Sequence, residues 1–277
     1  MHRWFAFAAL ALSACASAHP PTLEVAGDRL FIDAEVNGVA VDALLDSAAE
    51  ISLADKAWAA ANGLEAAGAE TAKGTGGAAA VAFVEGVTVK ALGTTLEDMP
   101  VAVLDLSDIS NRLIGRPVAF IMGRELFDKE RLSIDIEGGA ISIADRAVAP
   151  AGVRLPLTGE RGIETFKARV NGVEVAAEFD LGNGTDVLIG KQTAERLALL
   201  GDASSLEKRK GGGVGGEIER VIVHLAKLEI AGEVFENVEA AVDETENAGE
   251  LNIGVRLLRN FKIATDFSER AIWLEKR

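Results

Sequence analysis

The chain has 277 residues, enough for two domains of ordinary size or one large one. Hydrophobic residues make up 49% and charged residues 26%, a globular composition that excludes an intrinsically disordered chain. The net charge of −15 argues against partners that are bound through phosphates or anionic headgroups, so we expect no nucleic-acid partner.

Residues 1–18 have the features of a secretion signal. Arg3 provides the positive start, an apolar run follows from Trp4 to Leu12, and small residues come next. The run is shorter than the ~20 apolar residues that span a bilayer. The sequence therefore predicts an exported protein.

Two cleavage sites compete within this signal. Leu12-Ser13-Ala14-Cys15 resembles a bacterial lipobox, whereas Ala16-Ser17-Ala18 fits an ordinary signal peptidase. Cys15 is the only cysteine and lies where a lipobox needs it, so lipidation is the favoured reading. We expect a periplasmic, membrane-anchored or secreted protein that contacts the membrane only through Cys15, with no intrachain disulfide.

The first half of the chain begins with a hairpin that ends in an aspartate. Residues 29–36 and 39–45 alternate as strands around Asn37-Gly38, and Asp46 follows. A short helix is expected over 55–62, capped by Gly63. A glycine-rich segment over 66–80 and strands over 81–90 and 95–104 come next, and the polar stretch 107–116 is predicted to be a loop.

The first half closes with a strand over 120–122 that stops at Gly123, one helical turn over 124–129, and a hairpin of 132–136 with 140–143. Ala149-Pro150-Ala151-Gly152 then marks a boundary. We expect an N-terminal lobe over 19–148 and a C-terminal lobe over 149–277, each burying its own core.

The second half repeats this order. Residues 166–170 and 173–179 form the matching hairpin, and Asp180 lies 134 residues after Asp46, as Val170 lies 134 after Val36. A helix over 191–200 capped by Gly201, a glycine-rich segment over 211–216, strands over 218–230 and 234–242, and Leu251-Asn252-Ile253-Gly254 follow. Asp266 stands twelve residues after Gly254, as Asp135 does after Gly123. The ordered series indicates an internal duplication and a mainly β fold.

Two aspartates at matched positions of a duplicated unit can meet across a pseudo-twofold axis. Like charges that lie close together raise one pKa, so such a pair shares a proton. One carboxylate can then take a proton from water while its partner donates to the carbonyl under attack. The pattern therefore favours hydrolysis by an Asp46/Asp180 pair.

Here the sequence resembles the retropepsin and pepsin-like aspartic proteases. Leu44-Leu45-Asp46-Ser47-Ala48-Ala49 and Phe179-Asp180-Leu181-Gly182-Asn183 are similar to the family's aspartate loops, and Ile121-Met122-Gly123 and Asn252-Ile253-Gly254 to the segments behind them. The family's glycine-tipped flaps correspond to Gly74, Gly76 and Gly77 and to Gly213, Gly215 and Gly216. The resemblance implies a bilobal β fold with short helices and a cleft that binds a peptide or unfolded protein. It also implies catalysis by Asp46 and Asp180, with loop support from Ser47, Ala48, Leu181 and Gly182.

The chain departs from this family at two positions. Ala48 stands where the family has glycine, and Leu181 where it has a hydroxyl residue. In the family that hydroxyl reaches across to the opposite loop, so Ser47 is expected to do so and Leu181 is not. Two functions therefore stay open: an aspartic-type endopeptidase, or a catalytically inactive lipoprotein of the same fold that binds a peptide or protein.

Other site types are disfavoured. Gly211-x-Gly213-x-x-Gly216 matches a dinucleotide fingerprint, but a basic run precedes it and a strand follows, so a flap or loop is favoured. His224 falls within a strand with no nucleophile motif, and the scarcity of His and Cys leaves no zinc constellation. We expect no metal, no cofactor and, from the pseudo-dimeric duplication, a monomer.

Overall fold

The computed structural model describes residues 22–159, 162–201 and 205–277. The predicted signal over 1–18 and the predicted lipidation site at Cys15 lie outside the described residues. Over the residues that are described, no helix is both long and apolar enough to cross a membrane.

The first half of the chain consists of short helices and strands in the order expected from the sequence. These elements are β1 (Glu24–Ala26), β2 (Arg29–Val36), β3 (Val39–Leu45), β4 (Leu53–Asp55), α1 (Lys56–Ala61), β5 (Ala67–Gly74), β6 (Gly77–Ala91), β7 (Thr94–Leu104), α2 (Ser107–Ile109), the π-helical turn η1 (Ser110–Ile114), β8 (Phe120–Met122), α3 (Arg124–Lys129), β9 (Leu132–Asp135) and β10 (Ala140–Ile143).

The second half repeats that order. Its elements are β11 (Val153–Pro156), β12 (Thr165–Val170), β13 (Val173–Phe179), β14 (Val187–Gly190), α4 (Lys191–Arg196), β15 (Lys208–Gly213), β16 (Gly216–Ile230), β17 (Glu233–Asp243), β18 (Leu251–Ile253), α5 (Val255–Leu258), β19 (Phe261–Asp266) and β20 (Ala271–Lys276). The expected boundary between 148 and 149 falls in the segment that links β10 to β11.

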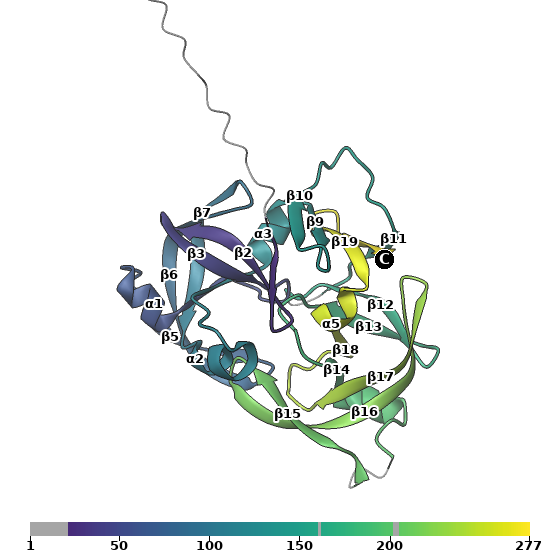
Figure 1. The fold of residues 1–277 in the computed structure, drawn as a ribbon. Helices are drawn as coiled ribbons and strands as arrows, with labels where there is room; N and C mark the ends of the chain where they lie inside the picture. The colour runs from purple at the N-terminus through teal and green to yellow at the C-terminus, as the bar shows by residue number, and fades with distance from the viewer. Residues whose placement is uncertain (1–21, 160–161, 202–204) are drawn as a thin grey trace, which may run out of the picture.

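The strands of the two halves follow one topology. Over the described residues, the N-half sheet has the order β1-β2-β3-β8-β4-β7-β6-β5, and the C-half sheet has β12-β13-β18-β14-β17-β16-β15. Without β1, each position of the first order has its counterpart in the second. Figure 1 shows the two lobes side by side, the first in purple to teal and the second in teal through green to yellow. The mainly β, two-lobed, duplicated fold is confirmed.

The two halves turn their hairpins with the same dipeptide. Asn37 and Gly38 have φ of 47° and 82°, and Asn171 and Gly172 have 50° and 82°. Both positions of a two-residue type I′ turn need positive φ, which asparagine and glycine tolerate best. The turns set the registers Val36 with Val39 and Val170 with Val173, so that each second strand runs into its aspartate.

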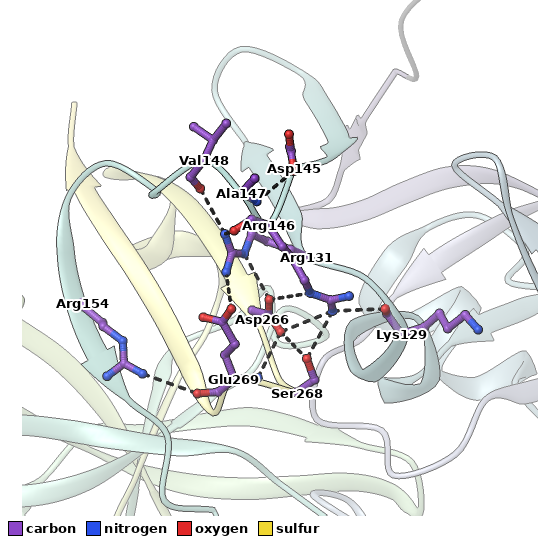
Figure 2. Close-up of polar contacts among 10 residues, drawn as sticks. All are labelled: Lys129, Arg131, Asp145, Arg146, Ala147, Val148, Arg154, Asp266, Ser268 and Glu269. Carbon is purple, nitrogen blue, oxygen red and sulfur yellow. Dashed lines mark hydrogen bonds and ion pairs between the residues drawn. The ribbon is translucent and has the colours of Figure 1, made fainter.

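A third sheet joins the lobes. Its order, β10-β9-β19-β20-β11, mixes strands from both halves of the chain. Figure 2 shows the polar cluster beside it, where Arg131 and Arg146 both bind Asp266. The Nε atoms of Arg131 and Arg146 lie 3.1 Å and 2.9 Å from Oδ2 of Asp266, and Nη2 of Arg131 lies 2.7 Å from Oε1 of Glu269. This Asp266 cluster ties residues 131 and 146 of the first half to the end of the second.

The expectation that each half buries its own core is wrong. One continuous cluster of buried apolar side chains contains residues from both halves. Phe127 stacks on Phe267 with ring centroids 5.2 Å apart, and Phe267 meets Phe179 edge to face at 6.4 Å. The joining sheet brings these rings together, and its strands are too far apart in the chain for local patterns to reveal the contact.

Two local expectations also need correction. Residues 107–114 of the expected loop 107–116 are helical, because Ile109, Leu113 and Ile114 face an apolar cluster while Arg112 binds Asp108 one turn away. The helix expected over 191–200 ends at Arg196.

The early end of α4 has a clear backbone cause. Ala198 has a φ of 54°, and the N–H groups of Ala198 and Leu199 donate to Glu195 and Ala194 at 3.0 Å and 2.9 Å. This is a Schellman cap with alanine in the left-handed position. Helix α1 ends in the same way at Gly63, as expected from the glycine. At the end of α4 the left-handed residue is Ala198, and an alanine does not mark a helix end in the sequence.

Candidate active site

Each aspartate loop is held from behind by a parallel strand. β3 pairs with β8, and the N–H of Asp46 donates to the carbonyl of Met122 at 2.9 Å. β13 pairs with β18, and the N–H of Asp180 donates to the carbonyl of Ile253 at 3.1 Å. The segments that resemble the family's supporting strands therefore lie where the resemblance implies.

The glycine that ends each supporting strand allows the loop to approach. A methyl group on Gly123 would lie 2.9 Å from the carbonyl oxygen of Ala49, and one on Gly254 only 2.1 Å from that of Asn183. These contacts are too close for any side chain. Both glycines are thus part of the packing that places the aspartate loops.

The two loops meet across the pseudo-twofold axis. Ser47 donates its hydroxyl to the carbonyl of Phe179 at 2.8 Å and accepts from the N–H of Leu181 at 2.9 Å. A methyl group on Gly182 would lie 2.2 Å from Cγ of Asp46, so this carboxyl packs directly on the second loop. The structure thus brings together Asp46, Ser47, Asp180, Leu181 and Gly182.

The loop grip is one-sided, as the sequence predicts. Leu181 is fully buried in the shared core and contributes apolar contact where Ser47 contributes hydrogen bonds. Ala48 keeps a helpful group, since its N–H donates to Oδ1 of Asp46 at 2.9 Å. Its φ is not positive, so alanine is unstrained in the position where the family has glycine.

Asp46 is a half-buried carboxyl with an unusual acidity. Burial and then the charge of Asp180 raise the pKa of Asp46 to about 7, while the N–H groups of Ala48 and Ala49 and the charge of Arg29 oppose the shift. Both N–H groups donate to the same oxygen, Oδ1, at 2.9 Å and 3.1 Å. A carboxyl with such a pKa can hold a proton near neutral pH.

Asp180 receives donors on both of its carboxyl oxygens, whereas the two donors of Asp46 reach the same oxygen. Its Oδ1 accepts from the N–H of Asn183 at 2.9 Å, and its Oδ2 accepts from Nδ2 of Asn252 at 2.8 Å. Burial raises the pKa of Asp180, and the hydrogen bond from Asn252 is the largest opposing influence. The two aspartates thus share their location but differ in their hydrogen bonds.

Arg29 is a site residue that the sequence did not indicate. Its side chain is buried at the start of β2, and its charge opposes the raised pKa of both aspartates. A methyl group on Gly184 would lie 1.7 Å from Nη1 of Arg29, so this glycine makes room for the guanidinium. Among the described residues, Nη1 has no hydrogen-bond partner. A single arginine at a strand start carries no sequence signal for such a role.

Glu178 and Asn252 were also not identified from the sequence. They are directly paired between β13 and β18, and Nδ2 of Asn252 donates to Oε2 of Glu178 at 3.0 Å. Burial raises the pKa of Glu178 to about 7. A comparison of the two repeats does indicate these residues, because the first repeat has the apolar residues Leu44 and Ile121 in the corresponding positions.

The glycine-rich segments form two hairpins whose tips touch. β5 and β6 close at Gly74 and Gly77, and β15 and β16 close at Gly213 and Gly216. The N–H of Gly76 donates to the carbonyl of Val214 at 2.9 Å. A methyl group on Gly76 would lie 2.4 Å from the carbonyl oxygen of Gly216, and one on Gly215 2.5 Å from the backbone of Gly77. Gly74, Gly76 and Gly215 lie too close to the opposite backbone for any side chain, and a methyl group on Gly213 would lie 2.2 Å from Oγ1 of Thr75. Gly77 and Gly216 instead have positive φ of 117° and 126°, which glycine tolerates best.

Each hairpin is held by one arginine from the opposite half. Arg112 of η1 donates to the carbonyl of Gly211 at 3.0 Å, and Arg220 of β16 donates to that of Thr75 at 2.5 Å. Figure 1 shows α2 and the following helical turn beside β15. The helix that replaces the expected loop at 107–116 thus has a place in the site, because it carries Arg112.

Over the same described residues, no group of three or more His, Cys, Asp and Glu side chains is arranged to hold a metal ion. The polar groups that converge between the lobes are the two carboxyls, their donors and Arg29. This arrangement can bind one shared proton and a water molecule.

Comparison with known proteins supports this description. The family model described as aspartyl protease matches residues 32–125 and 166–257, which is once in each half and more than half of the chain. No curated protein sequence matches at a significant level.

The chain also matches two solved structures. A retropepsin-like aspartic protease from Rickettsia conorii is 23% identical, with a TM-score of 0.37 over 44% of this chain and 89% of its own. Basic 7S globulin from soybean is 10% identical, with a TM-score of 0.52 over 92% of this chain and 94% of its own. The second likeness extends over nearly the whole of both chains.

Proposed function

The chain belongs to the aspartyl protease family, and we propose that it is an aspartic-type endopeptidase with Asp46 and Asp180 as its catalytic residues. The observation that carries the proposal is the contact between the two loops. The hydroxyl of Ser47 forms hydrogen bonds with the backbone of the residues before and after Asp180, and the carboxyl of Asp46 packs on Gly182.

The proposed reaction uses water and the two carboxyls. One carboxylate removes a proton from water as the water oxygen bonds to the carbonyl carbon of the peptide. The partner, a carboxylic acid, donates its proton to the carbonyl oxygen, which receives the electron pair of the broken π bond. The first carboxyl then gives its proton to the amide nitrogen as the C–N bond breaks. The partner regains a proton from a hydroxyl as the new carbonyl forms.

The substrate class is an extended peptide or an unfolded protein. The two flap hairpins, whose tips meet between the halves, support this proposal, since a strand-like chain offers backbone groups on both sides. The flap tips are held together by one backbone hydrogen bond and by arginine contacts, so substrate entry requires them to separate. We propose that one chain forms the complete site, with lobes over 19–148 and 149–277, and acts as a monomer.

The test is hydrolysis of an unstructured protein at pH 4 to 6 by the wild type, Asp46→Asn and Asp180→Asn. Each amide variant should lose all turnover and keep the wild-type circular dichroism spectrum, because the amide neither shares the proton nor acts as a base. Asp42→Asn is the matched control. Asp42 lies on β3, the strand that leads to Asp46, and its side chain is 62% exposed. Normal turnover by either catalytic variant would contradict the proposal.

A transition-state isostere inhibitor separates the two functions that the sequence leaves open. An active enzyme should be inhibited by it. Tight binding of the isostere to a wild-type protein that never hydrolyses a peptide would instead favour the peptide-binding alternative.

We also propose that the protein is exported and anchored through a lipid at Cys15. The support is the sequence pattern of residues 1–18, which lie outside the described residues. The wild type should fractionate with membranes, and Cys15→Ala should release it. A mature chain that begins at His19 would show that ordinary signal cleavage operates instead.

A further inference from the structure

The supporting strands of the two halves differ in one directly paired position. In the N-half, Leu44 of β3 pairs with Ile121 of β8, and both belong to an apolar cluster. In the C-half, Glu178 of β13 pairs with Asn252 of β18. The duplication therefore places an apolar pair behind Asp46 and a polar pair behind Asp180.

The amide of Asn252 is oriented by a chain of hydrogen bonds with a fixed direction. The backbone N–H of Thr185 can only donate, and it donates to Oδ1 of Asn183 at 2.8 Å. Nδ2 of Asn183 must then face Oδ1 of Asn252, at 2.8 Å. Nδ2 of Asn252 is left to face Oδ2 of Asp180 at 2.8 Å and Oε2 of Glu178 at 3.0 Å.

The direction of this chain favours a charged Asp180. An amide N–H donated to a carboxylate stabilises the ionised form, and Asp180 receives donors on both of its oxygens. The described residues give Asp46 two N–H donors, but both reach Oδ1. The second oxygen of Asp46 is the one that is free to carry a proton.

The remaining charged groups around the pair do not reverse this preference. Arg29 acts on both aspartates and favours the ionised form of each. Burial raises the pKa of Glu178 to about 7, and the charges of Asp180 and Asp243 act in the same direction. A neutral Glu178 leaves the amide of Asn252 with Asp180 as its charged acceptor.

We propose that Asn252 is a positioning residue that assigns the shared proton to Asp46 and keeps Asp180 as the carboxylate. Resting on the proposed endopeptidase function, this makes Asp180 the base that removes the proton from water. Asp46 is then the acid that protonates the carbonyl oxygen. In the second step Asp180 returns its proton to the leaving nitrogen, and Asp46 regains one from a hydroxyl, so the site ends as it began.

The first test measures proton binding without any catalysis. Carbon-13 NMR of labelled aspartate carboxyls can follow each member of the pair separately. The variant Asp46→Asn leaves Asp180 to titrate and Asp180→Asn leaves Asp46, so the coupling between the two carboxyls is removed. Asp180 should titrate at the lower pH. Adding Asn252→Leu, which keeps the shape but not the donor, should raise the pKa of Asp180 by about 1 to 2 units and leave Asp46 nearly unchanged.

Two further variants keep this test decisive. Glu178→Leu/Asn252→Ile reproduces the apolar pair of the N-half, and it should raise the pKa of Asp180 even if Asn252→Leu fails to fold. Asn62→Leu makes the same exchange at an exposed asparagine whose side chain donates to the carbonyl of Trp58, and it should change neither titration. An Asp46 that titrates below Asp180, or an Asp180 that ignores Asn252→Leu and the double variant, would overturn the proposal.

The second test is the pH profile of kcat/KM for the active enzyme. Its acidic limb reports the ionisation of the base, so Asn252→Leu should move that limb upward by the same 1 to 2 units, with a smaller effect on the basic limb. A protein that titrates as proposed but hydrolyses nothing would refute the endopeptidase function and keep the proton assignment. An active enzyme with an unmoved titration would refute the assignment alone.

Discussion

The Asp266 cluster predicts a stability loss whose size depends on pH. Burial would raise the pKa of Asp266, but hydrogen bonds from Arg146, Ser268, the backbone of Glu269 and Arg131 lower it to about 2. The ordinary value is 3.8, so the folded state binds the ionised form more strongly by nearly two pKa units. This difference corresponds to about 2.5 kcal/mol of stability at neutral pH.

The change to make is Asp266→Asn, which keeps the shape of the side chain and removes its charge. We expect the free energy of unfolding to fall by about 2–3 kcal/mol at pH 6. Because the pKa of Asp266 is lower in the folded state, its ionisation stabilises the folded protein fully at pH values above the unfolded pKa, near 4. This stabilisation is lost as the pH falls towards 2. At pH 3 the difference between wild type and variant should therefore shrink to about half.

The assay is urea unfolding followed by tryptophan fluorescence at pH 6 and pH 3. Trp273 is a suitable reporter, because the guanidinium of Arg131 lies 5.2 Å from its ring centroid. The matched control is Asp135→Asn at the equivalent position of the first half, where the carboxyl is 28% exposed and binds Arg277 at the surface. It should cost less than about 1 kcal/mol.

Equal losses in the two variants would show that burial of the Asp266 cluster does not matter. A loss in Asp266→Asn that is the same at pH 3 and pH 6 would show that the charge of Asp266 is not its source. Either result would refute the reasoning. If the prediction holds, the joining sheet loses stability in acid below the pH range proposed for catalysis.

Three further changes test the site. Ser47→Ala should lower the free energy of unfolding by about 1–3 kcal/mol in urea titrations, because it leaves the buried N–H of Leu181 without an acceptor; an unchanged midpoint would argue against the grip. Gly182→Ala should reduce kcat by at least about 100-fold, since its methyl group would displace the carboxyl of Asp46; wild-type kinetics would show that the loops can yield. Arg112→Ala should speed amide hydrogen exchange at residues 211–213 by about 10-fold, measured by mass spectrometry, and unaltered exchange would exclude the arginine as a flap fastener.

Local sequence patterns are enough to predict the repeated architecture and the positions of the two aspartates. These features depend on local patterns: alternation along a strand, Asn-Gly at a two-residue turn, and glycine where backbones come close. Asp46 and Asp180 follow such hairpins at a constant spacing, so their meeting could be expected from the duplication alone. The glycines of the flaps were found in the same way.

The charged and polar groups around those aspartates depend on tertiary contacts. Arg29 reaches them from the start of a strand, and Asn252 reaches Asp180 because β13 and β18 pair in parallel. Comparison of the repeats would have shown that Glu178 and Asn252 replace an apolar pair, but not that their side chains form a directed chain of donors. Such contacts join residues that are far apart along the chain, and their energies depend on burial and geometry that no local pattern encodes. The shared core and the Asp266 cluster likewise combine residues of both halves, so they depend on how the two halves pack together.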